Sequence, residues 1–305
     1  MTVRIGIPRG LLYYQYGALW EKFLQGLGAE VVVTGDTSKA TLDCGSVLDE
    51  VCLPVKVYFG HIYELASRNV DYLFTPRIIS VAAGQYCCPK IIGMPDILHS
   101  NMDQLPPLLD INVNLRQNGC NLYQAVIAAG RRLGKNPLFS LYAWHSAWQH
   151  HRREQHFFCP CRTDRQRIGL IGHSYIIHDH QLSMNVIGKL NNFGFEVITP
   201  EMVSLCQAAA AAKTLNKKIF WSNSHHMAGA ALTLIQSTPP VDGLIFMTSF
   251  ACGPDALIGE LIKRRAHALN IPCMLLTVDE HTAEAGFVTR LEAFTDMLSR
   301  RRQPC

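Results

Sequence analysis

The chain has 305 residues, of which 48% are hydrophobic, and it carries a mild formal net charge of +4. That length suits two domains or one large α/β unit. The weak charge and the lack of helix-turn-helix, zinc-finger or RNP patterns argue against a nucleic-acid partner. Because no apolar run approaches the ~18 residues that span a bilayer, and the N-terminus shows no secretory signal, we expect a cytoplasmic protein without membrane contact.

The first elements read as strand, glycine turn, helix and strand. Val3–Ile7 predicts a short apolar strand, and Leu11–Leu27 has helical periodicity that ends at Gly28. Glu30–Thr34 predicts the next strand. Further along the chain, strands are predicted at Tyr72–Pro76, Leu244–Thr248 and Met274–Val278, and helices at Asn121–Leu133 and Ala283–Arg302.

Three short phrases from the first part of the chain recur in the same order in the second part. The pairs are Arg4–Ile7 with Arg167–Leu170, Leu27–Val31 with Phe193–Val197, and Val70–Phe74 with Val241–Ile245. We therefore predict an α/β fold of two Rossmann-like parallel-sheet lobes that arose by internal duplication. The predicted lobes are residues 1–104 and 166–305, with a helical linker over 105–165.

Eleven cysteines are many for this length, and in a reducing compartment thiols serve metals or catalysis more often than disulfides. Cys52, Cys88 and Cys252 each stand one or two residues before a proline, at a predicted helix start or strand end. Three such thiolates are suited to an iron–sulfur cluster, and Cys-Pro ends known ligand runs of that type. The paired C-x-x-C spacing typical of zinc is absent from these positions. The alternative is that all three are buried structural cysteines.

The phrases around these cysteines resemble a known family. IGIPRGLLYYQYGALW, DEVCLPVKVYFGHI, YCCPKIIGMPD, FACGPDALIGELI and DEHTAEAGFVTRLEAF are similar to CoA-enzyme-activase-related proteins of unknown function, relatives of the 2-hydroxyacyl-CoA dehydratase subunits. The stretch from Leu105 to Arg165 matches poorly.

The resemblance implies a cluster held by Cys52, Cys88 and Cys252, of the 4Fe–4S type or, as in some relatives, a double-cubane cluster. It also implies reduction by a separate ATP-hydrolysing activator, since the chain lacks a G-x-x-x-x-G-K-[ST] loop of its own. A second dehydratase-like subunit or a homodimer is a further implied partner. The expected activity is that of a dehydratase- or reductase-type iron–sulfur component; a non-catalytic electron relay or assembly protein, and a cluster-free binding module, are the alternatives.

Several other residues are secondary candidates. Cys87 is an alternative ligand, although adjacent side chains of an extended segment point opposite ways. His173, Glu280 and His281 follow predicted strands and are candidates for acid–base catalysis, against the alternative of ordinary turns and a helix start capped by Thr282. Cys159 and Cys161 form a C-x-C pair to which the sequence assigns no role.

Overall fold

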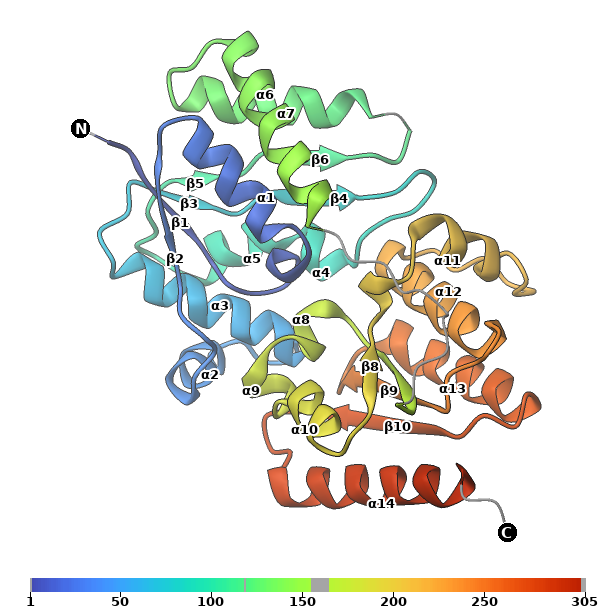
Figure 1. The fold of residues 1–305 in the computed structure, drawn as a ribbon. Coiled ribbons are helices and arrows are strands. Elements are labelled where there is room, and N and C mark those ends of the chain that lie inside the picture. Colours follow the sequence, from blue (N-terminus) through green and yellow to red (C-terminus); the bar gives the residue numbers. More distant parts are fainter. Residues whose placement is uncertain (1, 118, 155–164, 303–305) are drawn as a thin grey trace. The chain divides into compact units, whose positions relative to one another are not determined.

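The computed structural model describes residues 2–117, 119–154 and 165–302, and the predicted pair Cys159 and Cys161 lies outside them. The chain divides into two compact units, Met1–Gln155 and His156–Cys305. Figure 1 shows an α/β fold in both, with parallel strands and flanking helices, which confirms the predicted fold class.

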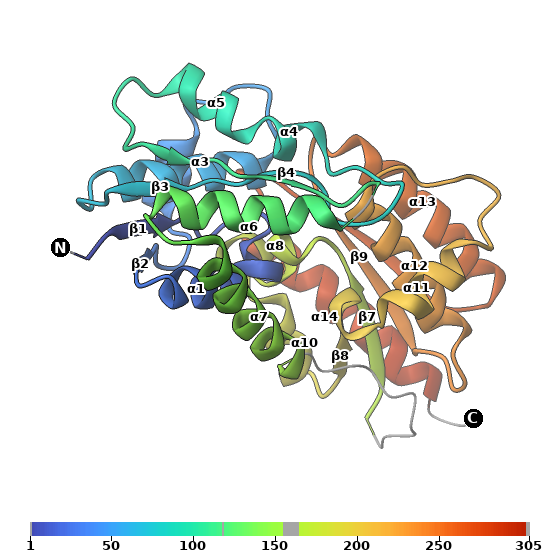
Figure 2. The same ribbon diagram turned by 90° about the horizontal axis from the view of Figure 1, so that it is seen from above.

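The elements of unit 1 are β1 (Arg4–Ile7), α1 (Tyr13–Gly26), β2 (Glu30–Val33), α2 (Lys39–Gly45), α3 (Leu53–Ala66), β3 (Tyr72–Phe74), β4 (Arg77–Ser80), α4 (Pro89–Ile92), α5 (Met94–Asn101), β5 (Leu108–Leu109), β6 (Asn112–Asn114), α6 (Cys120–Arg132) and α7 (Pro137–Arg153). Its main sheet has the order β2-β1-β3-β5, and β4 pairs with β6 in a second, two-stranded sheet. In Figure 2, α3 and α5 lie on one side of β3 and β4, and α6 and α7 lie on the other.

The elements of unit 2 are β7 (Arg167–Ile171), α8 (Ser174–Ile177), α9 (His180–Ser183), α10 (Val186–Asn192), β8 (Glu196–Ile198), the 3-10 helix η1 (Pro200–Met202), α11 (Leu205–Ala212), α12 (Ser222–Gln236), β9 (Gly243–Ser249), α13 (Gly253–Ala268), β10 (Cys273–Val278) and α14 (Glu284–Arg302). The sheet has the order β10-β9-β7-β8. Buried residues of β7 and β9 pack against α12 and α13 to form the core. A Cβ added at Gly243 would touch Leu298 of α14, so that helix covers the opposite face.

The two units repeat the same strand topology, since β2-β1-β3-β5 corresponds to β8-β7-β9-β10. The hydrogen bonds that join the strands are repeated as well. The backbone N–H of Arg4 donates to the Asp71 carboxylate at 2.7 Å, and that of Arg167 donates to the Asp242 carboxylate at 2.7 Å. In both units the helix before the second strand ends near a left-handed glycine: Gly28 at φ 82° follows α1, and Gly194 at φ 88° follows α10.

A close helix crossing is also present twice. A Cβ added at Gly60 of α3 would lie 2.0 Å from the Thr41 carbonyl oxygen of α2. A Cβ added at Gly229 of α12 would lie 2.1 Å from the Ala208 carbonyl oxygen of α11. Only glycine permits the two backbones to approach so closely. These paired details support the duplication that the sequence phrases predicted.

The segment expected to be a helical linker contains more than helices. It includes α6 and α7, which group with unit 1, and also the short strands β5 and β6. Leu108 and Leu109 are buried, and β5 pairs with β3 over Leu73–Phe74. Strands of two or three residues are too short to produce a recognisable period in the sequence, which is why the prediction omitted them.

Candidate metal centre

The strand order of unit 2 determines which loops meet. In this sheet β8 lies on one side of β7, and β9 and β10 lie on the other side. The direction in which successive strands are added therefore reverses between β7 and β9. In parallel α/β sheets, ligands bind outside the carboxyl ends of the strands at such a switch point. His173 follows β7, and Cys252 and Asp255 follow β9, so this topology brings the three residues to one edge.

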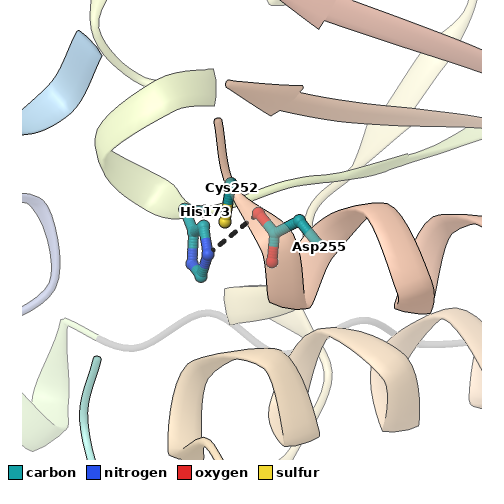
Figure 3. A group of neighbouring side chains, drawn as sticks. All are labelled: His173, Cys252 and Asp255. Carbon is teal, nitrogen blue, oxygen red and sulfur yellow. Dashed lines mark ion pairs between the residues drawn. The ribbon is translucent and has the colours of Figure 1, made fainter. Parts of the chain in front are cut away.

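His173, Cys252 and Asp255 form a compact cluster, named here the unit 2 trio. One ligand atom of each residue, a ring nitrogen, the thiol sulfur and a carboxylate oxygen, lies within 4.8 Å of the other two. His173 Nε2 lies 3.0 Å from Asp255 Oδ2. Figure 3 shows the Cys252 sulfur beside the His173 ring and the Asp255 carboxylate. A nitrogen, a sulfur and an oxygen donor are thus gathered in one place.

Asp255 is the most enclosed member, with no exposed surface. The Ser224 hydroxyl donates to Oδ1 at 3.3 Å, and the Thr248 hydroxyl donates to Oδ2 at 3.4 Å. Burial alone would raise the pKa of the Asp255 carboxyl. The nearby charge of His173 and hydrogen bonds from His173, Cys252 and Ser224 outweigh burial and lower that pKa below its ordinary value. The carboxylate is therefore held in its charged form, ready to face a cation.

Local backbone conformation sets the position of the trio. Cys252 is the N-cap residue of α13, and Asp255 lies in the first turn of that helix, where a negative charge is favoured by the helix dipole. Ala251, directly before Cys252, has a φ of 64°, in the left-handed region that residues with a Cβ seldom adopt. His173 is the N-cap residue of α8, and its ring stacks on Tyr175 with centroids 4.7 Å apart.

The other catalytic candidates lie in the loop after β10. Glu280 and His281 are exposed, and neither is a member of the trio. The Thr282 hydroxyl takes part in a turn before α14, because it donates to the Asp279 carboxylate at 2.8 Å and accepts from the Asp279 N–H at 2.9 Å. The acid–base role of Glu280 and His281 remains a prediction.

In unit 1, Cys52 and Cys88 are electrostatic neighbours. Cys52 is the N-cap residue of α3, and Cys88 is the N-cap residue of α4. Burial raises the pKa of the Cys52 thiol and the charge of Cys88 adds to the rise, whereas Lys90 and the Val55 N–H oppose it. Both thiols are half-buried. Two of the three predicted ligands are therefore near enough for their charges to interact, and the Lys90 ammonium group acts on Cys52 as well.

Cys87 is in a different environment from Cys88. Its side chain is 3% exposed, and burial, with the charge of Cys88 adding to it, raises the pKa of the Cys87 thiol to about 12. The Cys87 N–H donates to the Ile79 carbonyl at 2.9 Å. A buried thiol with such a high pKa behaves as an apolar core residue rather than as a ready thiolate.

Unit 1 has an apolar cavity at its own switch point, between β1 and β3. The cavity has a volume of about 50 Å³, and its lining includes Pro8, Leu11, Tyr58, Phe74 and Ile91. Leu11 there has a φ of 49°. The two units thus use the same topological position for different chemistry, a polar trio in unit 2 and an apolar cavity in unit 1.

Sequence reasoning missed Asp255, Ser224 and Thr248. The one available signal was the spacing of Cys252 and Asp255, which places both at the start of α13. An aspartate in a first helical turn is usually explained by the helix dipole alone, so this spacing did not indicate a site.

Fold and site together define a two-unit α/β protein with thiol-containing loops at the carboxyl ends of parallel strands. The profile of the family described as "CoA enzyme activase uncharacterised domain" matches residues 4–203. The chain belongs to this family, as the resemblance predicted. The matched part contains Cys52, Cys88 and His173 but ends before Cys252 and Asp255.

One curated relative is an uncharacterized protein of Methanocaldococcus jannaschii. It is 28% identical over 109 residues, which make up 35% of this chain and 26% of the relative. The matched stretch therefore spans about a quarter of that relative's length. Among the described residues, no helix is both long and apolar enough to cross a membrane.

Proposed function

We propose that the chain is an iron–sulfur redox protein of the 2-hydroxyacyl-CoA dehydratase/activase type, whose cluster is ligated by Cys52, Cys88 and Cys252. Its membership of a CoA-enzyme-activase-related family supports the assignment to this enzyme system. The observation that carries the proposal is the proximity of Cys52 and Cys88, which come from separate loops of unit 1. A 4Fe–4S cluster is the first candidate and a double-cubane cluster the second.

The donor set fits such a group. Thiolates are the usual ligands of iron–sulfur clusters, and all three cysteines carry half-buried thiols that are not part of a disulfide. Cys52 and Cys252 begin helices of 14 and 16 residues, whose N-terminal dipoles favour a thiolate. A bound cluster would supply one-electron transfer, and the protein would supply the ligands and the electrostatic environment.

Lys90 has a defined part in this proposal. Its charge opposes the rise in the pKa of Cys52, and its Nζ lies 3.4 Å from the Glu50 carbonyl oxygen. The hydrogen bond holds the ammonium group on the Cys52 loop. Lys90 therefore offsets part of the negative charge that thiolate ligation would gather there. Cys87 is the less suitable ligand, because its thiol is more buried and its pKa is about 12.

The partners follow from the same proposal. Electrons would come from an ATP-hydrolysing activator, and a second dehydratase-like subunit or an identical chain would complete the enzyme. A cytoplasmic location would keep the thiols reduced. Whether the chain acts as the dehydratase- or reductase-type component or as an electron relay is decided by acyl-CoA turnover with an activator and ATP.

The direct experiment is anaerobic expression and purification of the whole chain. We expect iron and acid-labile sulfide in similar amounts, together with an EPR signal that appears on reduction with dithionite. A protein free of iron and sulfide after anaerobic reconstitution would overturn the proposal and favour a cluster-free binding module.

A further inference from the structure

We propose that His173, Cys252 and Asp255 bind a single divalent transition-metal ion, with Zn²⁺ the best match to their donor atoms. This site goes beyond the iron–sulfur proposal, because it needs only residues of unit 2 and forms when Cys252 is not engaged by a cluster. It is a mononuclear site of mixed nitrogen, sulfur and oxygen ligands, in which the three side chains leave one tetrahedral position unfilled.

The donor atoms of the trio are of the types that Zn²⁺ binds. Zn²⁺ takes imidazole nitrogen, thiolate sulfur and carboxylate oxygen in tetrahedral sites. Three protein ligands with an open fourth position are the arrangement of its catalytic sites. Harder ions such as Mg²⁺ and Ca²⁺ prefer oxygen ligands alone, so the thiol and the imidazole select against them.

The distances between the three ligand atoms also suit one metal ion. Metal–ligand distances of about 2.0–2.3 Å in a tetrahedron place ligand atoms roughly 3.3–3.8 Å apart. In the trio, the imidazole nitrogen and the carboxylate oxygen are 3.0 Å apart, and all three ligand atoms lie within 4.8 Å of one another. Small changes of side-chain torsion therefore close the set around one ion, without movement of the strands that position it.

Two neighbouring hydroxyls orient the Asp255 carboxylate. Ligating carboxylates are usually oriented by hydrogen bonds from residues that do not touch the metal. Ser224 and Thr248 hold one oxygen each of the Asp255 carboxylate, from α12 and β9 respectively. Ser224 is 2% exposed, so its hydroxyl is shielded from water. Asp255 is thus fixed in place before any ion arrives, which lowers the entropic cost of binding.

The negative charge of the buried Asp255 carboxylate also favours a bound cation. Asp255 has no exposed surface and His173 is 7% exposed, so the carboxylate lies where an unpaired charge is costly. A divalent cation would neutralise the Asp255 carboxylate and a Cys252 thiolate together. Ion binding would release the protons of the thiol and of any imidazolium. In the absence of a metal, the His173 ring stabilises the buried Asp255 carboxylate instead.

Cobalt titration of the full chain tests the site. Protein freed of cluster and metal is titrated with Co²⁺ under argon with a thiol-free reductant. We expect one Co²⁺ per chain, thiolate-to-cobalt charge-transfer absorption, and displacement of that absorption by Zn²⁺. His173→Gln, Cys252→Ser and Asp255→Asn should each remove the band or weaken binding by more than tenfold.

Matched variants make the test specific. The double variant Cys52→Ser/Cys88→Ser should bind Co²⁺ as the wild type does, and so should Cys206→Ser, which changes an exposed thiol. Ser224→Ala should reduce affinity by about 10–100-fold while the band is retained at saturation, because it removes only an orienting contact. Circular dichroism confirms that each variant is folded, and the small Cys252→Ser change keeps the test valid if Asp255→Asn is unstable.

The outcomes separate this site from the cluster. Failure of the wild type to bind Co²⁺, or binding that survives all three trio variants, would show that the trio is a structural ion pair only. Loss of the band in the Cys52/Cys88 double variant would also overturn the mononuclear site, because unit 1 thiols would then be required. Iron and sulfide content after anaerobic reconstitution is measured separately and reports on the iron–sulfur proposal, which shares Cys252 with this site but also requires Cys52 and Cys88.

Discussion

His173 Nε2 lies 3.0 Å from Asp255 Oδ2, although the two residues follow different strands and lie at the starts of different helices. Asp255 is fully buried, so the pair is shielded from water. We expect Asp255→Ala to destabilise the protein by about 3–5 kcal/mol, because it removes the carboxylate that His173 and the Ser224 hydroxyl contact. Asp255→Asn should cost about 1–3 kcal/mol.

Urea denaturation followed by circular dichroism measures both changes. Glu260→Gln is the matched control, since Glu260 lies on the same helix in an exposed pair with Arg264 at 2.8 Å. We expect no measurable shift of its midpoint. Equal effects of the Asp255 and Glu260 changes would contradict a buried, structurally coupled pair.

The repeated helix crossing gives a second prediction. Gly229→Ala should destabilise the protein by about 1–3 kcal/mol, because the new methyl group would lie 2.1 Å from the Ala208 carbonyl oxygen. Gly286→Ala on α14 is the control, since nothing lies within 4 Å of the added carbon. That change should stabilise by up to about 1 kcal/mol. Thermal unfolding of the two variants should give midpoints shifted in opposite directions.

The repeat itself was predictable because it depends on local phrases. Arg4 and Arg167, with Asp71 and Asp242, were matched from sequence, and they make equivalent hydrogen bonds in the structure. The trio was not predictable to the same degree. His173 and Cys252 were candidates by position, but the burial and partners of Asp255 depend on α12 and β9 packing around it, which no local pattern encodes.

Thiol reactivity gives a third prediction. Alkylation requires the thiolate, and burial raises the pKa of Cys87 to about 12. At pH 8, Cys120 and Cys206, which are exposed, should react with iodoacetamide at least about a hundredfold faster than Cys87. Mass spectrometry of peptides from a time course measures the rates. In denaturant the three rates should converge; fast labelling of Cys87 in the folded chain would contradict its assignment as a core residue.

A fourth prediction concerns acid stability. Burial would raise the pKa of Glu201, but the hydrogen bond and charge of His178 outweigh it, and the pKa lies below its ordinary value. A carboxyl whose folded-state pKa is lowered contributes stability above its unfolded-state pKa, and that contribution is lost as pH falls through the folded-state pKa. Glu201→Gln should therefore lose less stability than the wild type as pH falls below about 4.5.

Unfolding midpoints measured from pH 6 down to pH 3 test this expectation. Glu292→Gln, which changes an exposed carboxylate of α14, should follow the wild-type curve. His178→Gln should resemble Glu201→Gln, because it removes the partner that lowers the pKa. Parallel curves for the wild type and Glu201→Gln would show that the pair does not contribute.

Iron and acid-labile sulfide content of cysteine variants tests the central proposal most directly. The wild type, Cys52→Ala, Cys88→Ala, Cys252→Ala and the control Cys273→Ala are reconstituted anaerobically side by side and checked for folding. We expect iron and sulfide in the wild type and in Cys273→Ala, and loss of most of both in each of the other three variants. Full iron and sulfide content in those three variants, or none in the wild type, would contradict the assignment of these cysteines as cluster ligands.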